Sequence, residues 1–347
     1  MLQFLLDISA FYSIYLILSL SLNLEFGYAG VPNFGKVLLV AGGAYVVAGF
    51  SGRMAQWILG VAPNLDFISD NTAVIAEVNA KLQVEIGIAI FVFLITLVIA
   101  ALIGGFLGFL ASYPAIRLRE DYLGMTLLAI GEIARVVGQN QPQIAGGSIG
   151  VQVPDPFVWV GELRFAVMTL ILIAAAALTF LYSERIARSP LGRLLRSVRD
   201  NEMAAQSLGK DTTRVRMKIL VVGSAISALA GGLYAFYAAG VVATTYNRVD
   251  WTFWPWLILI IGGAANNLGV AAGSLLFIAT RRLVEYYKDT LVFLPFNVIW
   301  VEYLILGGVL ILVLIYRPEG LIPEKPTPTI KEKEIAALLK SYPKQKK

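Results

Sequence analysis

The feature that most constrains this chain is a set of three long stretches without Asp, Glu, Lys or Arg. They cover residues 86–116, 219–247 and 251–280. An apolar run of about 18 residues or more is long enough to cross a bilayer as a helix, and a buried helix of a soluble core is usually shorter. Charged residues make up 15% of the sequence, against roughly 25% in soluble domains. The sequence therefore predicts an integral membrane protein.

The missing residue types exclude several kinds of chemistry. The 347 residues include no cysteine and no histidine, which removes disulfides, thiol nucleophiles, imidazole acid–base groups and the usual zinc sites. A membrane-embedded enzyme is therefore not expected. The net charge of +5 does not indicate a nucleic-acid partner, because its distribution follows membrane topology, as shown below.

The hydrophobic segments predict an all-α polytopic bundle of about eight spans. No Lys or Arg precedes the first of them, unlike in a cleavable signal peptide, so we expect it to be retained. The spans are placed at about residues 4–27, 34–51, 85–112, 121–139, 163–182, 217–242, 253–284 and 299–316.

The seventh predicted span contains a break signal. Residues 262–269 read Gly-Gly-Ala-Ala-Asn-Asn-Leu-Gly, and glycine and asparagine favour turns over helix interiors. Broken backbone at membrane depth is tolerated where it is buried in protein or lines a water-filled cavity. The segment is either one long kinked helix or two shorter helices that meet at a break, and we favour the second.

The distribution of Lys and Arg predicts the orientation, because such residues accumulate in cytoplasmic loops. They are concentrated in the loop 183–218 and in the tail 317–347, so both are expected in the cytoplasm. An even number of crossings must then separate them, which the two-helix interpretation provides. Loops 51–84 and 140–162 are then expected outside, and Arg281 and Arg282 lie toward the outer face, against the rule.

The cytoplasmic loop carries the signals of two short helices. Ser189 suits an N-cap and Pro190 the first helical position, for a helix that runs to about Arg199. Asp200 or Asn201 can cap a second helix over residues 202–208, and Gly209 suits its left-handed end. The exposed face of the second helix is expected to be Ala204, Ala205 and Leu208. The loop is either a solvated basic linker or a docking element, and the helix signals favour docking.

This loop resembles a segment of a known family. Its pattern is Arg193-x-x-Arg196-x-x-Arg199-Asp200-Asn201-Glu202-x-Ala204-Ala205-x-x-x-Gly209, which is similar to the cytoplasmic "EAA" region of ABC importer permeases, in particular the LivM type of branched-chain amino acid permease. The resemblance implies a coupling helix that docks on an ATP-hydrolysing subunit. Glu202, Ala204, Ala205 and Gly209 would dock, and Arg196, Arg199 and the adjacent Asp200 would position them.

Other segments extend the resemblance over nearly the whole chain. They are residues 21–45, 122–133, 146–150 and the ending Arg317-Pro318-Glu319-Gly320-Leu321. Two departures concern the expected solute path. Ala-Ala-Asn-Asn follows Gly262-Gly263 where the family usually continues Gly-Gly-x-Gly, and residues 32–35 look more like the paired LivH-type subunit. Both leave the exact solute open.

Polar residues within or between the spans are candidates for contact with a solute, since ionisable groups are costly there. Glu132 and Arg135 can form an ion pair along one helix or contact solute. The asparagines could bind a zwitterion or simply join helices. The glycines could let a loop approach the pore or form a turn. The candidates for the path are Asn23, Asn33, Glu132, Gly146, Gly147, Asn266 and Asn267.

The sequence therefore predicts a permease domain over residues 1–316 with a coupling loop at 183–218, followed by a cytoplasmic tail at 317–347 that is expected to be flexible. The sequence contains no Gly-x-x-x-x-Gly-Lys-Ser/Thr motif, so ATP and magnesium are expected on partner subunits and no cofactor on this chain. The resemblance implies two ATPase subunits, a second related permease and an extracytoplasmic solute-binding protein. The alternatives are a permease for urea, amides or other small polar solutes, and an ion-coupled secondary carrier.

Overall fold

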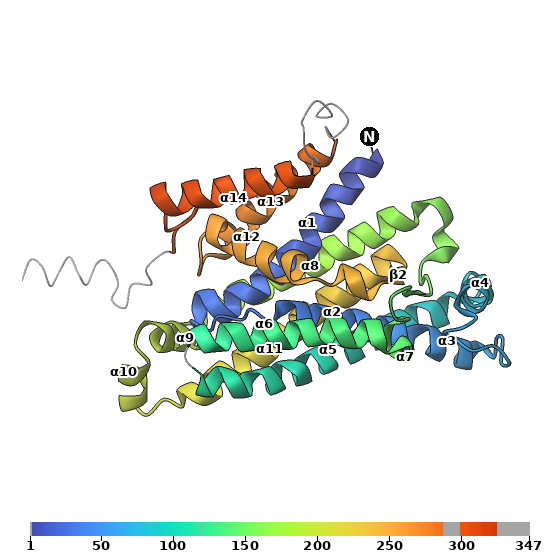
Figure 1. Ribbon diagram of the computed structural model, residues 1–347, viewed down its shortest axis with the longest axis horizontal. Helices are drawn as coiled ribbons and strands as arrows, with labels where there is room; N and C mark the ends of the chain where they lie inside the picture. The colour runs from blue at the N-terminus through green and yellow to red at the C-terminus, as the bar shows by residue number, and fades with distance from the viewer. Residues whose placement is uncertain (1, 119, 287–298, 325–347) are drawn as a thin grey trace, which may run out of the picture.

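The computed structural model describes residues 2–118, 120–286 and 299–324 and consists almost entirely of helices. The long helices lie side by side along one axis, as Figure 1 shows. Helices α9 (Pro190–Asp200) and α10 (Glu202–Ser207) form one end of the bundle, and α3 (Gly52–Leu59) and α4 (Asn71–Leu82) lie at the other. We call these the α9–α10 end and the α3–α4 end. The predicted all-α membrane fold is confirmed.

Five helical segments are each long and apolar enough to cross a membrane, and all five were predicted as spans. They are Gln3–Tyr28, Lys36–Leu59, Ile86–Pro114, Val158–Arg188 and Thr212–Ala238. Their elements are α1 (Leu2–Leu22) with the π-helical turn η1 (Asn23–Tyr28), α2 (Lys36–Val46) with the turn η2 (Val47–Ser51) and α3, α5 (Ile86–Arg117), the 3₁₀ turn η3 (Val158–Leu163) with α8 (Arg164–Arg188), and α11 (Thr212–Ala238).

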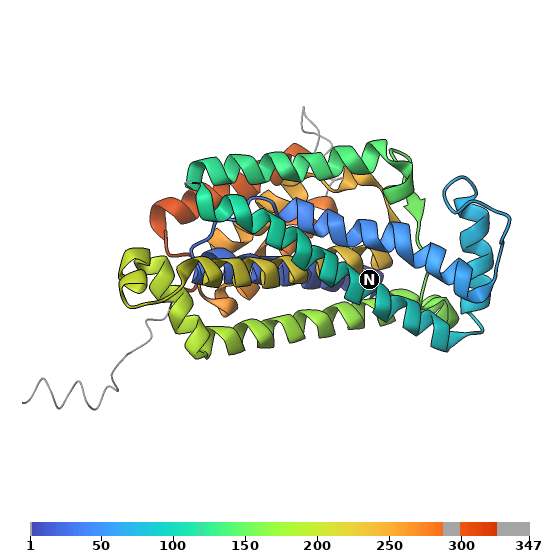
Figure 2. The ribbon, with the colours of Figure 1, turned by 90° about the horizontal axis from the view of Figure 1, so that it is seen from below.

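The other three predicted spans are also helical but deviate from this pattern. Helix α6 (Glu120–Asn140) is a single helix that carries charged residues. Helix α14 (Ile299–Tyr316) contains a shorter apolar stretch, Val301–Tyr316. The span expected at 253–284 is a pair of helical segments bent by 119° at a break. In Figure 2, α6 and α8 run along opposite sides of the bundle, with α11 between them.

The broken pair is formed by the turn η5 (Val249–Phe253) with α12 (Trp254–Gly262), and by α13 (Asn267–Tyr286). The chain reverses between them at Gly263 and Ala265, which both have positive φ. The segment that follows α14 lies against this reversal. After the broken pair and α14, the chain is again at the α9–α10 end, where α11 began (Figure 1). The interpretation of two helices that meet at a break is confirmed.

Close glycine contacts place α11 at the centre of the bundle. A Cβ atom at Gly104 of α5 would lie 2.2 Å from the Cβ of Ala228, and one at Gly43 of α2 would lie 1.9 Å from the Ala228 carbonyl oxygen. A Cβ at Gly231 of α11 would likewise approach the Val40 carbonyl oxygen to 2.0 Å. In a bilayer, helices associate through such small residues because the hydrophobic effect no longer drives them together.

The α3–α4 end is closed by short irregular elements. Strands β1 (Val151–Gln152) and β2 (Gly240–Val241) pair antiparallel, next to α7 (Pro142–Ala145) and the 3₁₀ turn η4 (Ala243–Thr245). The Asn71 side chain at the start of α4 accepts the backbone N–H of Gln152 at 2.7 Å. This bond fixes α4 against β1 and ties the loop after α3 to the loop after α6.

The beginning of the tail is packed rather than free, which corrects the expectation of a flexible end from Pro318 onward. The Leu321 N–H donates to the Ile261 carbonyl at 2.8 Å, and the Ile322 N–H donates to the Gly262 carbonyl at 3.1 Å. Residues 317–324 therefore fill the α12–α13 reversal. The rest of the tail, residues 325–347, lies outside the described residues.

Candidate functional site

The two predicted loop helices are present, with the predicted caps. The Ser189 hydroxyl accepts the N–H of Gly192, and Pro190 occupies the first turn of α9. The Asn201 side chain accepts the N–H of Ala204 at 2.9 Å and begins α10. Of the two possible caps it is therefore Asn201, while Asp200 ends α9. Gly209 has a φ of +74° after α10, as expected of a left-handed helix end.

The outward face of α10 differs in part from the expected one. Ala204 is exposed and Leu208 is 79% exposed, but Ala205 is only 3% exposed and packs within the chain. Met203, which was not among the residues expected on this face, is 79% exposed. The surface available to a partner is therefore Met203, Ala204 and Leu208, with Ala205 behind it, because successive residues of a helix point to different faces.

Helix α9 is bound to the bundle by two arginines. Arg196 and Arg199 each place a guanidinium nitrogen 2.9 Å from a different carboxylate oxygen of Glu324. Arg199 also donates to the Gly27 carbonyl of η1 at 2.5 Å, and Arg196 lies over the Tyr28 ring. Charge-assisted bonds of this kind are stronger than neutral ones. The predicted arginine spacing thus serves to attach α9 to η1 and to the C-terminal segment.

Helix α10 is bound to the first turns of α11. Glu202 forms an ion pair with Arg216 at 2.8 Å, and the Gln206 amide donates to the Thr212 hydroxyl at 2.9 Å. Asp200, in contrast, pairs only with the neighbouring Arg199 among the described residues, at 2.9 Å. Glu202 therefore turns partly inward, and its role within this chain is to fix α10 on α11.

Three of the predicted path asparagines meet at the α12–α13 reversal. The buried Asn23 side chain accepts the Ala265 N–H at 2.8 Å and donates to the Asn267 side chain at 2.9 Å. Asn267 in turn donates to Glu184 of α8 at 2.9 Å. Asn266 caps α13 by accepting the N–H groups of the two residues after Asn267. These bonds satisfy the amides within the protein, which supports helix joining rather than solute contact.

The fourth asparagine belongs to a buried ion pair between the first two spans. Glu25 of η1 and Lys36 of α2 approach to 2.8 Å, and both side chains are inaccessible to solvent. Asn33 donates to the same Glu25 oxygen at 3.0 Å and accepts the Gly35 N–H at 2.9 Å. The Lys36 ammonium also donates to the hydroxyls of Ser21 and Ser227, both at 2.9 Å.

This cluster connects three helices at the centre of the molecule. All three donors of the Lys36 ammonium are used, and Ser227 brings in α11. The Cβ of any larger residue at position 223 of α11 would lie 2.2 Å from Glu25 Oε1, so Gly223 makes room for the carboxylate. Ionisable groups inside a membrane are rare, paired and usually important for function.

The remaining path candidates lie elsewhere. Glu132 and Arg135 of α6 form the predicted ion pair, with about a third of each side chain exposed. Gly146 and Gly147 both have positive φ and form a turn beside β1, where a Cβ at position 146 would collide with the Gly150 backbone. The structure therefore does not bring the seven candidates together. Three lie at the α9–α10 end and the two glycines at the α3–α4 end.

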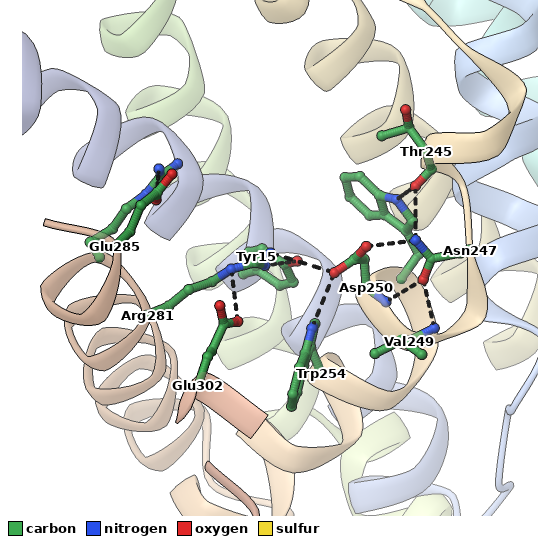
Figure 3. A network of polar contacts seen from close by, with 11 residues as sticks. Tyr15, Thr245, Asn247, Val249, Asp250, Trp254, Arg281, Glu285 and Glu302 are labelled. Atoms are coloured by element: carbon green, nitrogen blue, oxygen red, sulfur yellow. Dashed lines mark hydrogen bonds and ion pairs between the residues drawn. The ribbon is translucent and has the colours of Figure 1, made fainter. Parts of the chain in front are cut away.

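A second charged cluster contains the two arginines that the expected orientation places toward the outer face. Figure 3 shows Arg281 of α13 between Asp250 and Glu302, at 3.6 Å and 3.1 Å, and it also donates to the Tyr15 hydroxyl at 3.1 Å. Arg282 pairs with Asp7 of α1 at 3.1 Å. Both arginines therefore have ion-pair partners within the protein.

Sequence reasoning missed Glu25, Lys36, Asp250 and Glu302 as members of these clusters. A signal was available for Glu25, Lys36 and Glu302, because each is an ionisable residue inside a predicted span, which is unusual by itself. Their partners could not be predicted, since the pairing of Glu25 with Lys36, for example, depends on how η1 turns toward α2. Glu324 carried no comparable signal, because it lies in a polar segment with other charged residues.

Comparison with known proteins identifies the family to which this chain is similar. The family model described as "Branched-chain amino acid transport system / permease component" matches residues 4–314. The chain is 39% identical over 328 residues to the "Probable branched-chain amino acid transport permease protein LivM" of Methanocaldococcus jannaschii, with 93% of this chain and 94% of that protein covered.

More distant relatives show the same relationship. The "High-affinity branched-chain amino acid transport system permease protein LivM" of Escherichia coli is 26% identical, with 91% of this chain and 69% of that protein covered. The "Probable branched-chain amino acid transport permease protein LivH" of M. jannaschii is 22% identical, with 78% and 77% covered. No solved structure matches the chain. The match over residues 4–314 and the LivM relatives show that this chain belongs to the permease-component family of branched-chain amino acid transport systems and is of the LivM type.

Proposed function

We propose that this chain is one permease subunit of an ATP-driven importer of branched-chain amino acids, moved by separate ATPase subunits through α9 and α10. The observation that supports this most is the attachment of the two capped helices to the bundle. Helix α10 is ion-paired to α11 through Glu202, and α9 to η1 and the C-terminal segment through Arg199. A passive linker needs no such attachment.

The contacts define how a movement would be transmitted. A force on Met203 and Leu208 reaches α11 through Glu202 and Arg216. A force on α9 reaches η1 at Gly27, two residues from Glu25 of the buried ion pair. Packed helices change position as discrete bodies rather than by continuous deformation. The bundle would therefore rock as a unit between two orientations, which gives alternating access to the solute.

The proposed partners follow from the family and from the exposed surfaces. Two ATPase subunits would serve this chain and a second, related permease, and an extracytoplasmic binding protein would deliver the solute at the α3–α4 end. Glu132 and Arg135 on α6 are partly exposed, and such a pair is costly against lipid. The second permease or a water-filled path between the two permeases would cover it. The α9–α10 end and the tail are then cytoplasmic.

The solute is proposed from the names of the relatives, which specify branched-chain amino acids. A permease for urea, amides or other small polar solutes is the alternative in the same class. An ion-coupled carrier is the alternative in another class, and the buried Glu25–Lys36 pair is the observation in its favour, because carboxylates inside membranes serve in proton relays. Uptake by this chain alone in vesicles, abolished by an ionophore, would establish the carrier and refute the importer.

The test uses the outward face of α10. Met203→Asp and Leu208→Asp place a charge on side chains that are mostly exposed in the single chain, so folding is retained. At an interface, losing such an apolar contact costs about 2 kcal/mol or more. We expect capture of the ATPase subunits by the purified permease pair to weaken about thirty-fold, with a parallel loss of ATP-dependent uptake of leucine in proteoliposomes.

The matched control is Val84→Asp, because Val84 is 80% exposed but lies between α4 and α5 at the opposite end. It should leave ATPase capture unchanged. Wild-type capture and coupled uptake in both α10 variants would refute the coupling assignment. If the wild-type permease pair captures the ATPase subunits but takes up urea instead of leucine, the coupling assignment stands and the proposed solute is wrong.

A further inference from the structure

An apolar pocket of about 460 Å³ lies at the α9–α10 end, apart from the contacts described above. Three membrane-spanning helices and α9 form its walls. The residues that line it include Phe109 of α5, Tyr182 and Ile186 of α8, Leu194 of α9, and Val222 and Lys218 of α11. Lys218 is the only charged residue among its lining residues.

The position of the pocket places it at the surface of one membrane leaflet. Ile186 lies in the last turn of α8 and Lys218 in the second turn of α11, so the pocket opens where these spans leave the hydrocarbon. The partly exposed Tyr182 ring in its wall is typical of this level. Lipid, rather than bulk water, surrounds a cavity between spanning helices at this depth. Its apolar walls suit a hydrocarbon chain, since few polar groups are present to hold water.

The charge at the rim specifies the head group. Lys218 is exposed and has no ion-pair partner among the described residues. Arg185 and Arg193 are also exposed and unpaired in the described part of the chain, and each is next in sequence to a residue that lines the pocket, Ile186 or Leu194. A long lysine side chain can extend from an apolar wall to the head-group layer. Basic pockets between spanning helices are sites for anionic lipid head groups.

We propose that this pocket binds a phospholipid with an anionic head group, with one acyl chain between α8–α9 and α11 and the phosphate against Lys218. The lipid would fill the space between α8, which leads into α9, and α11, to which α10 is bound. It would thereby link the composition of this leaflet to the rigidity of the coupling element. The proposal depends on the membrane embedding of the chain and not on which solute it transports.

The test measures lipid binding directly. The full chain in detergent is titrated with phosphatidylglycerol or phosphatidylcholine and observed by native mass spectrometry. We expect one tightly bound phosphatidylglycerol and weaker phosphatidylcholine binding. Lys218→Gln should lower phosphatidylglycerol affinity about five-fold, as expected for one basic residue at a lipid surface. Lys210→Gln is the control, because Lys210 is also exposed and unpaired in the described structure but is not in the pocket wall, and it should bind as wild type.

A second measurement examines the acyl chain and needs no variant for its main result. Phosphatidylglycerol with a photoreactive group at the chain end is cross-linked to the wild-type protein, and the modified peptides are identified. We expect cross-links in residues 182–195 and 215–222, which Val222→Trp should abolish. Ile173→Trp should not abolish them, because Ile173 is exposed on the face of α8 opposite Tyr182.

Three results would overturn the proposal. The first is cross-linking confined to exposed residues on other faces of α8, such as Leu170 and Ile173, which would indicate annular lipid only. The second is equal binding of the two lipids with no effect of Lys218→Gln. The third is retention of the cross-links in a folded Val222→Trp protein. Loss of leucine transport affects none of these readouts, so the proposal and the proposed function can fail separately.

Discussion

At the scale of single residues, the buried pair of Glu25 and Lys36 carries the largest energetic consequence. The two side chains are completely inaccessible, and the Lys36 ammonium uses its three donors on Glu25, Ser21 and Ser227. Such a pair does not guarantee stability, because removing two charges from water costs as much as their attraction returns. Breaking it is different, since one charge then remains buried alone.

We therefore predict that Lys36→Met lowers the free energy of unfolding by about 3–5 kcal/mol. The Glu25 carboxylate would keep only the bond from Asn33 in a site without solvent. The measurement is reversible unfolding of the purified chain in mixed micelles. Arg188→Met is the control, because Arg188 is 80% exposed in its pair with Glu184 and should cost less than about 1 kcal/mol.

The double variant Glu25→Gln with Lys36→Met separates charge from packing. It leaves no buried charge, so most of the lost stability should return relative to Lys36→Met alone. A double variant less stable than the single one would contradict this explanation and show that the shape of the two side chains matters more than their charges.

At the scale of elements, the contact between α5 and α11 depends on which glycine faces the partner helix. A Cβ at Gly104 would meet Ala228 Cβ at 2.2 Å and the Ser224 backbone at 2.9 Å, whereas a Cβ at Gly105 would find its nearest neighbour, on Val221, at 3.6 Å. The two residues are adjacent in the sequence and identical in type, so only the rotation of the helix distinguishes them.

We predict that Gly104→Ala destabilises the protein by about 1–3 kcal/mol, because an inserted methyl group forces the helices apart. Gly105→Ala should be neutral or stabilising by up to about 1 kcal/mol, since alanine is the better helix former. Thermal unfolding of the two variants in the same detergent measures the difference. Equal stability of the two would show that α5 does not pack on α11 through this face.

The attachment of α9 is a second property of elements rather than residues. Arg196 and Arg199 converge on Glu324, which lies more than 120 residues away in the sequence. The Glu324 side chain is 26% exposed, so solvent screens its ion pairs with the two arginines only partly.

We predict that Glu324→Gln increases amide hydrogen exchange in α9 about ten-fold, the equivalent of a charged hydrogen bond worth roughly 1.5 kcal/mol. Glu319→Gln is the control, because Glu319 is exposed and has no ion pair in the described structure, and exchange in α9 should not change. Unaltered exchange in the Glu324 variant would mean that α9 is held by its apolar contacts alone.

At the scale of the whole molecule, the arrangement of the helices makes a prediction about sidedness. Helix α10, which contains Ala204, lies at one end of the bundle together with Glu324 near the end of the described chain. Ile149, which is 93% exposed, lies between α7 and β1 at the other end. Lys and Arg are concentrated toward the first of these ends, which the positive-inside rule assigns to the cytoplasm.

We predict that Ile149→Cys is labelled by a membrane-impermeant maleimide in intact cells and that Ala204→Cys is labelled only after permeabilisation. The chain contains no cysteine, so the wild type serves as the background. Labelling of Ala204→Cys from outside would invert the topology and refute the proposed contact with a cytoplasmic ATPase.

The sequence by itself determined the features that depend on local composition. Uncharged runs predicted the spans, and Ser189, Pro190, Asn201 and Gly209 predicted the two loop helices, because caps act within a few residues of the helix they end. The break after Gly262 was also evident, since glycine and asparagine mark turns wherever they occur. The need for an even number of crossings between the two segments rich in Lys and Arg also favoured two helices at this break.

Only the tertiary structure decided which polar groups meet. Asn23 lies with Asn267, and Lys36 with Ser227 nearly two hundred residues away, because the packing of glycine-lined helices sets their rotation and depth. A pattern along the chain indicates that a buried charge needs a partner, but it does not specify which helix supplies one. For the same reason the inward position of Ala205 and the binding of Glu324 by two arginines could be established only from the folded molecule.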